Sequence, residues 1–202
     1  MAPTALAHAR AVQLLDRYGI LTRETALAEG IEGGFAGVYP VLKAMEEQGL
    51  VRRGYFVAGL GAAQFAVPGA VDRLRDRRPA ETVSGQVLVL AATDPAQPYG
   101  AALAWPAAPG RPARAAGALV VLVDGEAAVF TERGGRSLLV FPAGLVDPAW
   151  AYALAGVVRS GRRRAMEISR IDGAPSRESP HADLLRQAGF SDGYRGLVLR
   201  NR

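Results

Sequence analysis

Arginine is the residue type through which this sequence could do chemistry. Lys43 is its only lysine, so 23 of its 24 basic residues are arginines. The planar guanidinium group matches phosphate groups and base edges better than a lysine ammonium does. Two groups of residues, each rich in arginine, are therefore candidate nucleic-acid contacts. The first group is Lys43, Arg52, Arg53 and Tyr55, and the second is Arg162, Arg163 and Arg164.

Each group also has an interpretation that needs no ligand. Arg52 and Arg53 are neighbours on an expected strand, so they point to opposite faces and only one can face a given ligand. Both could equally be solvated charges at a strand edge, which discourage aggregation. The run 162–164 could be a solvated connection between a helix and a strand. The helix that carries Lys43 also carries two glutamates, which oppose the phosphate neutralisation that drives DNA binding.

Catalytic candidates are few. The side-chain amide of Gln64 could take part in catalysis, but an ordinary position on a strand face is the stronger interpretation. Asp94, Asp172 and Asp192 each adjoin turn residues, where local turn formation explains an aspartate without catalysis. We predict no catalytic residue.

The segment 93–116 contains five prolines and two glycines, which predicts a long irregular loop. Its Tyr99 and Trp105 could stack on unpaired bases. They could also fill the open end of a barrel, and this second interpretation is favoured because a large aromatic side chain gains more free energy from burial.

Composition excludes several classes of site. The sequence has no cysteine, so it can form neither a disulfide, a catalytic thiolate nor a cysteine-ligated zinc site. His8 and His181 have no partner at metal-ligand spacing, so no metal site is expected. No G-x-x-x-x-G-K-[ST] loop is present, so these residues cannot hold ATP and magnesium in the manner of a P-loop enzyme. The longest aliphatic run, 118–123, is too short to span a membrane, and we expect a cytoplasmic protein without a membrane partner.

The net charge of +5 is distributed unevenly along the chain. Residues 1–80 carry +2, residues 81–160 carry −1 and residues 161–202 carry +4. The basic excess therefore points to two local candidates, the arginines near residue 52 and those near the C-terminus.

The first eighty residues predict a winged helix-turn-helix. Apolar residues recur at helical spacing, and glycines end the helices. Thr22 is a plausible N-cap of the second helix. The order of helix, short strand, helix, turn, helix and hairpin is that of the winged helix. The expected elements are helices at 4–18, 23–29, 35–49 and 68–78, an extended link at 20–21, and strands at 50–58 and 63–67.

The remainder predicts a second module dominated by strands. Asp124-Gly125 is a strong signal for a hairpin between 118–123 and 126–130. The other expected elements are strands at 87–92, 137–141, 164–171 and 194–199, with helices at 147–158 and 181–188. The fold class is therefore α+β, with a winged-helix domain at 1–80 and a mostly antiparallel, barrel-like α+β domain at 81–202.

Several strings of the sequence resemble one protein family. They are QLLDRYGILTRETALAEGIEGGFAGVYPVLKAMEEQGLVRRGYFVAGLGAAQFAVPGAVDRLR, LAATDPAQPYGAALAWP, GALVVLVDGEAAVFTERGGRSLLVF, RIDGAPSRESPHADLLRQAGF and YRGLVLR. Together they resemble the C-terminal region of bacterial large helicase-related (Lhr) proteins over nearly the whole chain. Members of this family are superfamily 2 DNA helicases, whose long C-terminal extension combines winged-helix modules with a β-barrel-like module. That extension is similar in architecture to AlkZ-type DNA glycosylases.

Three hypotheses about function follow. The first is a DNA-binding and assembly module of a DNA repair helicase, whose partners are DNA and a helicase core in the same polypeptide. The resemblance implies that ATP and Mg²⁺ would bind that core, which these residues do not include. The second hypothesis is part of an AlkZ-like glycosylase site, and the third is a protein-interaction module that forms homo-oligomers.

Overall fold

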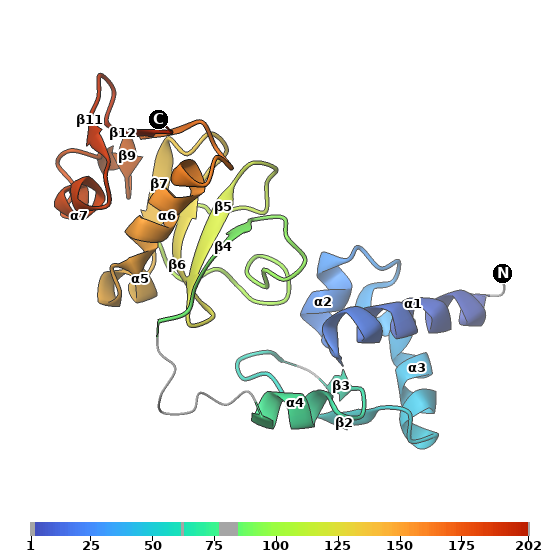
Figure 1. Ribbon diagram of the computed structural model, residues 1–202. Coiled ribbons are helices and arrows are strands. Elements are labelled where there is room, and N and C mark those ends of the chain that lie inside the picture. Colours follow the sequence, from blue (N-terminus) through green and yellow to red (C-terminus); the bar gives the residue numbers. More distant parts are fainter. Residues whose placement is uncertain (1–2, 62, 77–84, 202) are drawn as a thin grey trace. The chain divides into compact units, whose positions relative to one another are not determined.

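The computed structural model describes residues 3–61, 63–76 and 85–201 (Figure 1). The chain divides into two compact units, and each is described by itself. Unit 1 contains the described residues up to 76, and unit 2 contains those from 85 onward, except that Ala101–Leu103 are grouped with unit 1. The predicted boundary between residues 80 and 81, and the end of the helix expected at 68–78, lie outside the described residues.

Unit 1 is a winged helix, as the order of its elements predicted. Its helices and strands follow one another in the expected order, and the strands form one antiparallel sheet in the order β1-β3-β2. The hairpin of β2 and β3 is the wing. The elements are α1 (Pro3–Tyr18), β1 (Ile20–Leu21), α2 (Arg23–Ala28), α3 (Gly34–Glu47), β2 (Arg52–Gly54), β3 (Gln64–Ala66) and α4 (Ala70–Asp76).

Local chemistry starts the second and third helices. Thr22 forms a capping box at the start of α2, because its hydroxyl accepts a hydrogen bond from the Thr25 backbone N–H and the Thr25 hydroxyl accepts one from the Thr22 N–H. Gly33 precedes α3 with a φ of 76°, a left-handed conformation that glycine adopts without strain. Both the predicted cap and the predicted turn are confirmed.

Pro40 lies inside a helix. α3 begins at Gly34, which places Pro40 in the second turn rather than in the first, where proline is best tolerated. Proline has no backbone N–H, so the carbonyl of Ala36 receives no helical hydrogen bond from it. The helix persists because its other face is buried against α1, through Val38, Leu42 and the buried residues of that helix.

Unit 2 has two sheets. The larger has six strands in the order β10-β9-β7-β6-β5-β4, antiparallel except for the parallel pair β7 and β9. The smaller has three antiparallel strands in the order β11-β12-β8. The strands are β4 (Val87–Ala91), β5 (Leu119–Val123), β6 (Glu126–Thr131), β7 (Ser137–Val140), β8 (Ala165–Ile168), β9 (Arg170–Ile171), β10 (Ala174–Pro175), β11 (Ser191–Asp192) and β12 (Leu197–Arg200). The helices are α5 (Pro142–Val146), α6 (Ala149–Arg159) and α7 (Ala182–Gln187).

Both faces of the larger sheet are covered. The helix α6 packs on one face through Trp150, Leu154 and Val158 (Figure 1). The loop between β4 and β5 covers the other face, where Trp105 packs against Phe130 and Phe141. The aromatic side chains of this loop are thus packed on a sheet face rather than in the end of a barrel.

The predicted barrel is not confirmed. Among the described residues, β4 and β10 are the two edges of an open sheet, and neither pairs with the other. The single strand expected at 164–171 is also wrong, because the chain leaves the smaller sheet after Ile168 and joins the larger one at Arg170. Ser169 lies between them, and its backbone N–H donates to the carbonyl of Arg136 instead of extending β8.

Candidate nucleic-acid interface

The basic residues of the winged helix face acidic neighbours. The Lys43 Nζ lies 3.9 Å from a carboxylate oxygen of Glu47, one turn further along α3. The Arg53 Nε lies 3.3 Å from a carboxylate oxygen of Glu46, so the wing is tied to α3 by an ion pair. Arg52 points to the other face of β2 and is exposed, with no ion pair to any described residue. Of the three cations, Arg52 alone is left unneutralised.

Gln64 fixes the shape of the wing. Its side-chain carbonyl accepts hydrogen bonds from the backbone N–H groups of Phe56 and Val57, each at 2.8 Å. Its amide nitrogen donates to the carbonyl oxygens of Val57 and Leu60. The side chain is fully buried and uses all four of its hydrogen-bonding positions, so it serves the fold of the wing. Tyr55, just before this loop, is 85% exposed.

The run 162–164 divides into different roles. Arg163 is partly buried and its guanidinium donates to the carbonyl oxygen of Gly117, which lies 46 residues earlier. This burial lowers the pKa of the Arg163 guanidinium below its ordinary value, although an arginine stays charged in proteins. Arg162 and Arg164 are exposed and form no ion pair with any residue that the structure describes. Arg163 therefore has a structural contact, and its two neighbours are available to a ligand.

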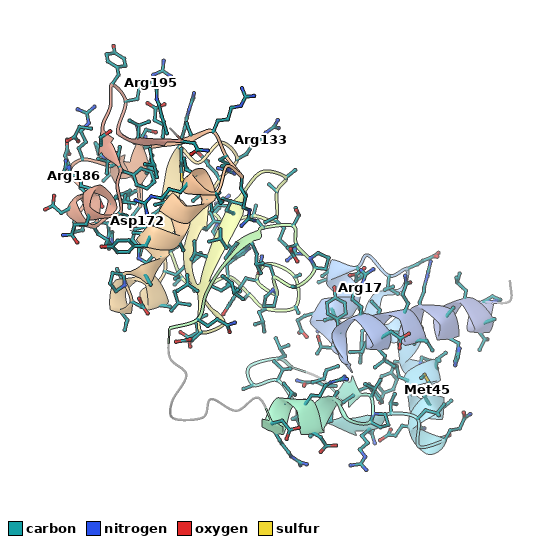
Figure 2. All side chains as sticks on the ribbon, viewed as in Figure 1. Arg17, Met45, Arg133, Asp172, Arg186 and Arg195 are labelled. Atoms are coloured by element: carbon teal, nitrogen blue, oxygen red, sulfur yellow. The ribbon has the colours of Figure 1, made fainter. Side chains whose placement is uncertain are left out.

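Arg133 and Arg136 join this region from the turn between β6 and β7. A Cβ atom on Gly135, between them, would lie 3.2 Å from the Arg163 guanidinium, and one on Gly117 would lie 3.2 Å from the Arg133 side chain. The turns at 117, 132–136 and 161–164 are therefore adjacent at one end of the larger sheet, and Figure 2 shows Arg133 on this turn. We call Arg133, Arg136, Arg162 and Arg164 the arginine cluster. All four are exposed.

Arg133 and Arg136 are not among the contacts predicted from the sequence. They flank Gly134-Gly135, which forms the turn between β6 and β7. Their positions on either side of a tight turn were a usable signal, because a hairpin turn places its flanking side chains at the rim of a sheet. What brings them beside residues 161–164 is the contact of Arg163 with Gly117, which no local pattern encodes.

The side chains weighed for catalysis have structural contacts. The Asp94 carboxylate accepts from the Ala96 backbone N–H at 2.8 Å, which is the predicted Asx turn. The Asp172 carboxylate accepts from the Val140 N–H across the sheet, a longer-range contact than the predicted turn. The Asp192 carboxylate pairs with Arg186 at 3.0 Å, and this hydrogen bond lowers the pKa of Asp192.

The histidines lie apart from any metal-ligand group. His8 is exposed on α1 of unit 1, and His181 of unit 2 precedes α7 and makes an edge-to-face ring contact with Trp150. No three metal-ligating side chains gather anywhere in the part of the chain that the structure describes. No helix in that part is long and apolar enough to cross a membrane.

Comparisons with known proteins give one family and two relatives. The family described as "Large helicase-related protein, winged-helix domain" matches residues 1–86. The chain is 49% identical over 210 residues to the "Lhr helicase/ probable uracil glycosylase" of Mycolicibacterium smegmatis. It is 40% identical over 195 residues to the "Lhr helicase/uracil glycosylase" of Escherichia coli. These alignments cover 98% and 94% of this chain but 14% and 13% of the two relatives, so the chain spans about one seventh of their length.

Proposed function

Because this chain corresponds to the C-terminal region of a large helicase-related (Lhr) protein, we propose that it is a DNA-binding and assembly module of an ATP-dependent DNA repair helicase. The module holds DNA for a helicase core that lies elsewhere in the parent polypeptide. We assign no ATP hydrolysis to these residues, since they contain no phosphate-binding loop.

The arginine cluster is the observation that carries this proposal. Four exposed guanidinium groups lie at one end of unit 2, and Glu132 is the acidic residue among the three turns that hold them. A protein gains affinity for DNA when it neutralises phosphates and releases their condensed counterions. Cations that already have an acidic partner contribute less to this release. The cluster therefore supports DNA contact more strongly than Lys43 and Arg53 do.

A salt titration tests the proposal. Binding of the whole chain to a short DNA duplex is measured by fluorescence anisotropy between about 50 and 200 mM salt. We expect the double variant Arg162→Ala and Arg164→Ala to reduce the slope of log K against log salt by about 1.8, since each phosphate contact contributes about 0.9. The matched control replaces Arg10 and Arg75, which pair with Glu32 and Asp72. No binding by the wild type at low salt, or equal slopes for both double variants, would contradict the proposal.

The names of the two relatives favour a second candidate, a contribution to a uracil glycosylase. Such an enzyme needs a pocket for a flipped base and a group that supports cleavage of the bond to the sugar. We assign no residue to that step. Release of free uracil from a uracil-containing oligonucleotide by this chain would support the candidate. Absence of release would limit this chain to binding.

A further inference from the structure

The tip of the hairpin formed by β11 and β12 carries a solvent-exposed tyrosine. Tyr194 is 94% exposed, the highest exposure of any large hydrophobic side chain described. It stands between Gly193 and Arg195, and Figure 2 shows Arg195 projecting from the same tip. Burial of an aromatic ring is energetically favourable, so an exposed ring can contribute to binding when a partner covers it.

The backbone below Tyr194 is fixed. The Arg177 guanidinium donates to the carbonyl oxygens of Gly193 and Tyr194, at 2.7 and 2.9 Å. The Gly193 N–H donates to the carbonyl of Gly196 and closes the turn. Gly196 packs so tightly on β8 that a Cβ atom there would lie 2.1 Å from the carbonyl oxygen of Ile168. The tip is therefore a rigid support for an exposed ring.

A groove leads from this tip across the outer face of β8 and β12. It has a volume of about 430 Å³. Its lining includes the side chains of Arg164, Glu167, Tyr194, Val198, Arg200 and Asn201. The strand register explains the arrangement, because Arg200 is paired with Ala165 and Val198 with Glu167. From Arg200 to Leu197 the strand extends about 10 Å, at about 3.3 Å per residue. Arginines thus lie at one end of the groove and the tyrosine at the other.

Charge in the groove is positive in balance. Glu167 is the acid in its lining, against Arg164 and Arg200. Asp192, two residues before Tyr194 and next to the turn, is held by Arg186. Arg164 is also a member of the arginine cluster, so the groove continues from a surface already proposed to contact phosphates.

We propose that this groove binds single-stranded DNA, with Arg164 and Arg200 on the backbone phosphates and the ring of Tyr194 stacked on an unpaired base. The inference rests on the proposed DNA-binding function and adds the site and the strandedness of the ligand. Grooves that bind single strands combine arginines along the backbone with aromatic rings on which bases stack. A duplex cannot use the ring in this way, because its bases are already stacked on each other.

Two tyrosine variants of the whole chain test the inference. Anisotropy of a labelled 15-nucleotide oligo-dT gives the affinity of Tyr194→Ala and of Tyr152→Ala. The second is a matched control, since Tyr152 is also an exposed tyrosine of unit 2 and lies on α6, outside the lining of the groove. We expect Tyr194→Ala to weaken binding about tenfold, because loss of one stacked base is worth about 1–3 kcal/mol. Tyr152→Ala should change it less than about twofold, and Tyr194→Phe should restore the wild-type affinity.

The outcomes separate this inference from the proposed function. If the wild type binds neither the oligo-dT nor a duplex at low salt, the proposed function fails and the inference fails with it. If the wild type binds oligo-dT but Tyr194→Ala binds as tightly, the inference is overturned and DNA binding by the arginine cluster remains. An equal loss for both alanine variants, or the same loss against a blunt duplex, also overturns it. A loss confined to Tyr194→Ala and to the single strand supports it.

Discussion

The wing of unit 1 and the β11–β12 hairpin of unit 2 are built alike but differ in charge. Each is an antiparallel hairpin with an exposed tyrosine near arginines, and each is held in shape by one buried or anchored side chain, Gln64 in the wing and Arg177 in the hairpin. In the wing, however, the neighbouring helix α3 supplies glutamates to Arg53 and Lys43. In unit 2 the neighbouring turns supply further arginines.

This difference shows that the winged-helix fold does not by itself locate a DNA contact. The third helix and the wing of such a domain commonly face DNA. Here α3 presents Glu46 and Glu47 on the side of Lys43 and Arg53, and acidic side chains reduce the gain from phosphate neutralisation. The less familiar unit 2 carries the unneutralised charge.

Gly196→Ala should damage unit 2 most. The added Cβ atom would lie 2.1 Å from the Ile168 carbonyl oxygen and 2.7 Å from Ser169 Cα, both of them backbone atoms that cannot move aside. We expect a loss of about 3 kcal/mol in the free energy of unfolding, as for other overpacked sites. Urea unfolding followed by tryptophan fluorescence measures it, since Trp105 and Trp150 both lie in unit 2.

The matched change in the wing is Gly61→Ala. A Cβ atom on Gly61 would meet no atom within 4 Å. This variant should leave the free energy of unfolding within about 1 kcal/mol of the wild type. Equal stability of the two variants would show that the tip at Gly196 is not tightly packed.

Gln64→Leu should open the wing without affecting unit 2. The change removes four hydrogen bonds and leaves the N–H groups of Phe56 and Val57 without their partner. We expect unit 1 to lose about 2 kcal/mol, the penalty for unsatisfied backbone groups that water can partly reach. Circular dichroism at 222 nm follows the helices, most of whose described residues lie in unit 1, and unchanged tryptophan fluorescence shows that unit 2 is intact. A variant as stable as the wild type would contradict the role assigned to Gln64.

The double variant Glu46→Gln and Glu47→Gln should make the charge around the wing more similar to that around the β11–β12 hairpin. The double change frees Arg53 and Lys43 from their carboxylates. We expect duplex affinity at low salt to rise about threefold to fivefold, with a salt slope steeper by up to about two. Asp72→Asn, which frees Arg75 on α4, is the control. Unchanged affinity and slope in the double variant would mean that this face does not approach DNA.

Removal of the ion pair between Asp192 and Arg186 should have the smallest effect on the protein. The hydrogen bond from Arg186 lowers the pKa of the Asp192 carboxyl, so the folded state favours its charged form. The resulting stability is present above the pKa of the unfolded chain, about 3.9, and is lost as the pH falls through the lower folded value. In Arg186→Gln we expect the carboxyl pKa, followed by carbon-detected NMR, to rise toward about 3.9. An unchanged pKa would show that another cation holds Asp192.

Local chemistry made much of the fold predictable. The Asp124-Gly125 hairpin was predicted because both residues adopt positive φ, at 49° and 85°, and few residue pairs do so. The cap at Thr22 was predicted for a similar reason, since its partner lies three residues away. The resemblance to the C-terminal region of Lhr proteins is likewise confirmed by the relatives in two species.

Features that depend on distant residues were not predictable. The strand expected at 164–171 alternates in a regular way, but it is divided because Arg136, 33 residues earlier, accepts from Ser169. The barrel was expected from the number of strands, and closure depends on strand lengths and edges that composition does not reveal. The candidate site was predicted in part: the run 162–164 was identified, but its division by Arg163 was not.

The hydrogen bond from Arg163 to Gly117 has a consequence for the order in which the chain acquires its charge pattern. The two residues are 46 positions apart, and Arg133 and Arg136 lie between them. Contacts of such separation require a large loop to close, which slows folding. Before that step the four arginines of the cluster are scattered along a flexible chain, and afterwards they share one surface. Tight binding of a polyanion therefore indicates that unit 2 has its native fold. Polyanion binding measured during refolding would report when the larger sheet has formed.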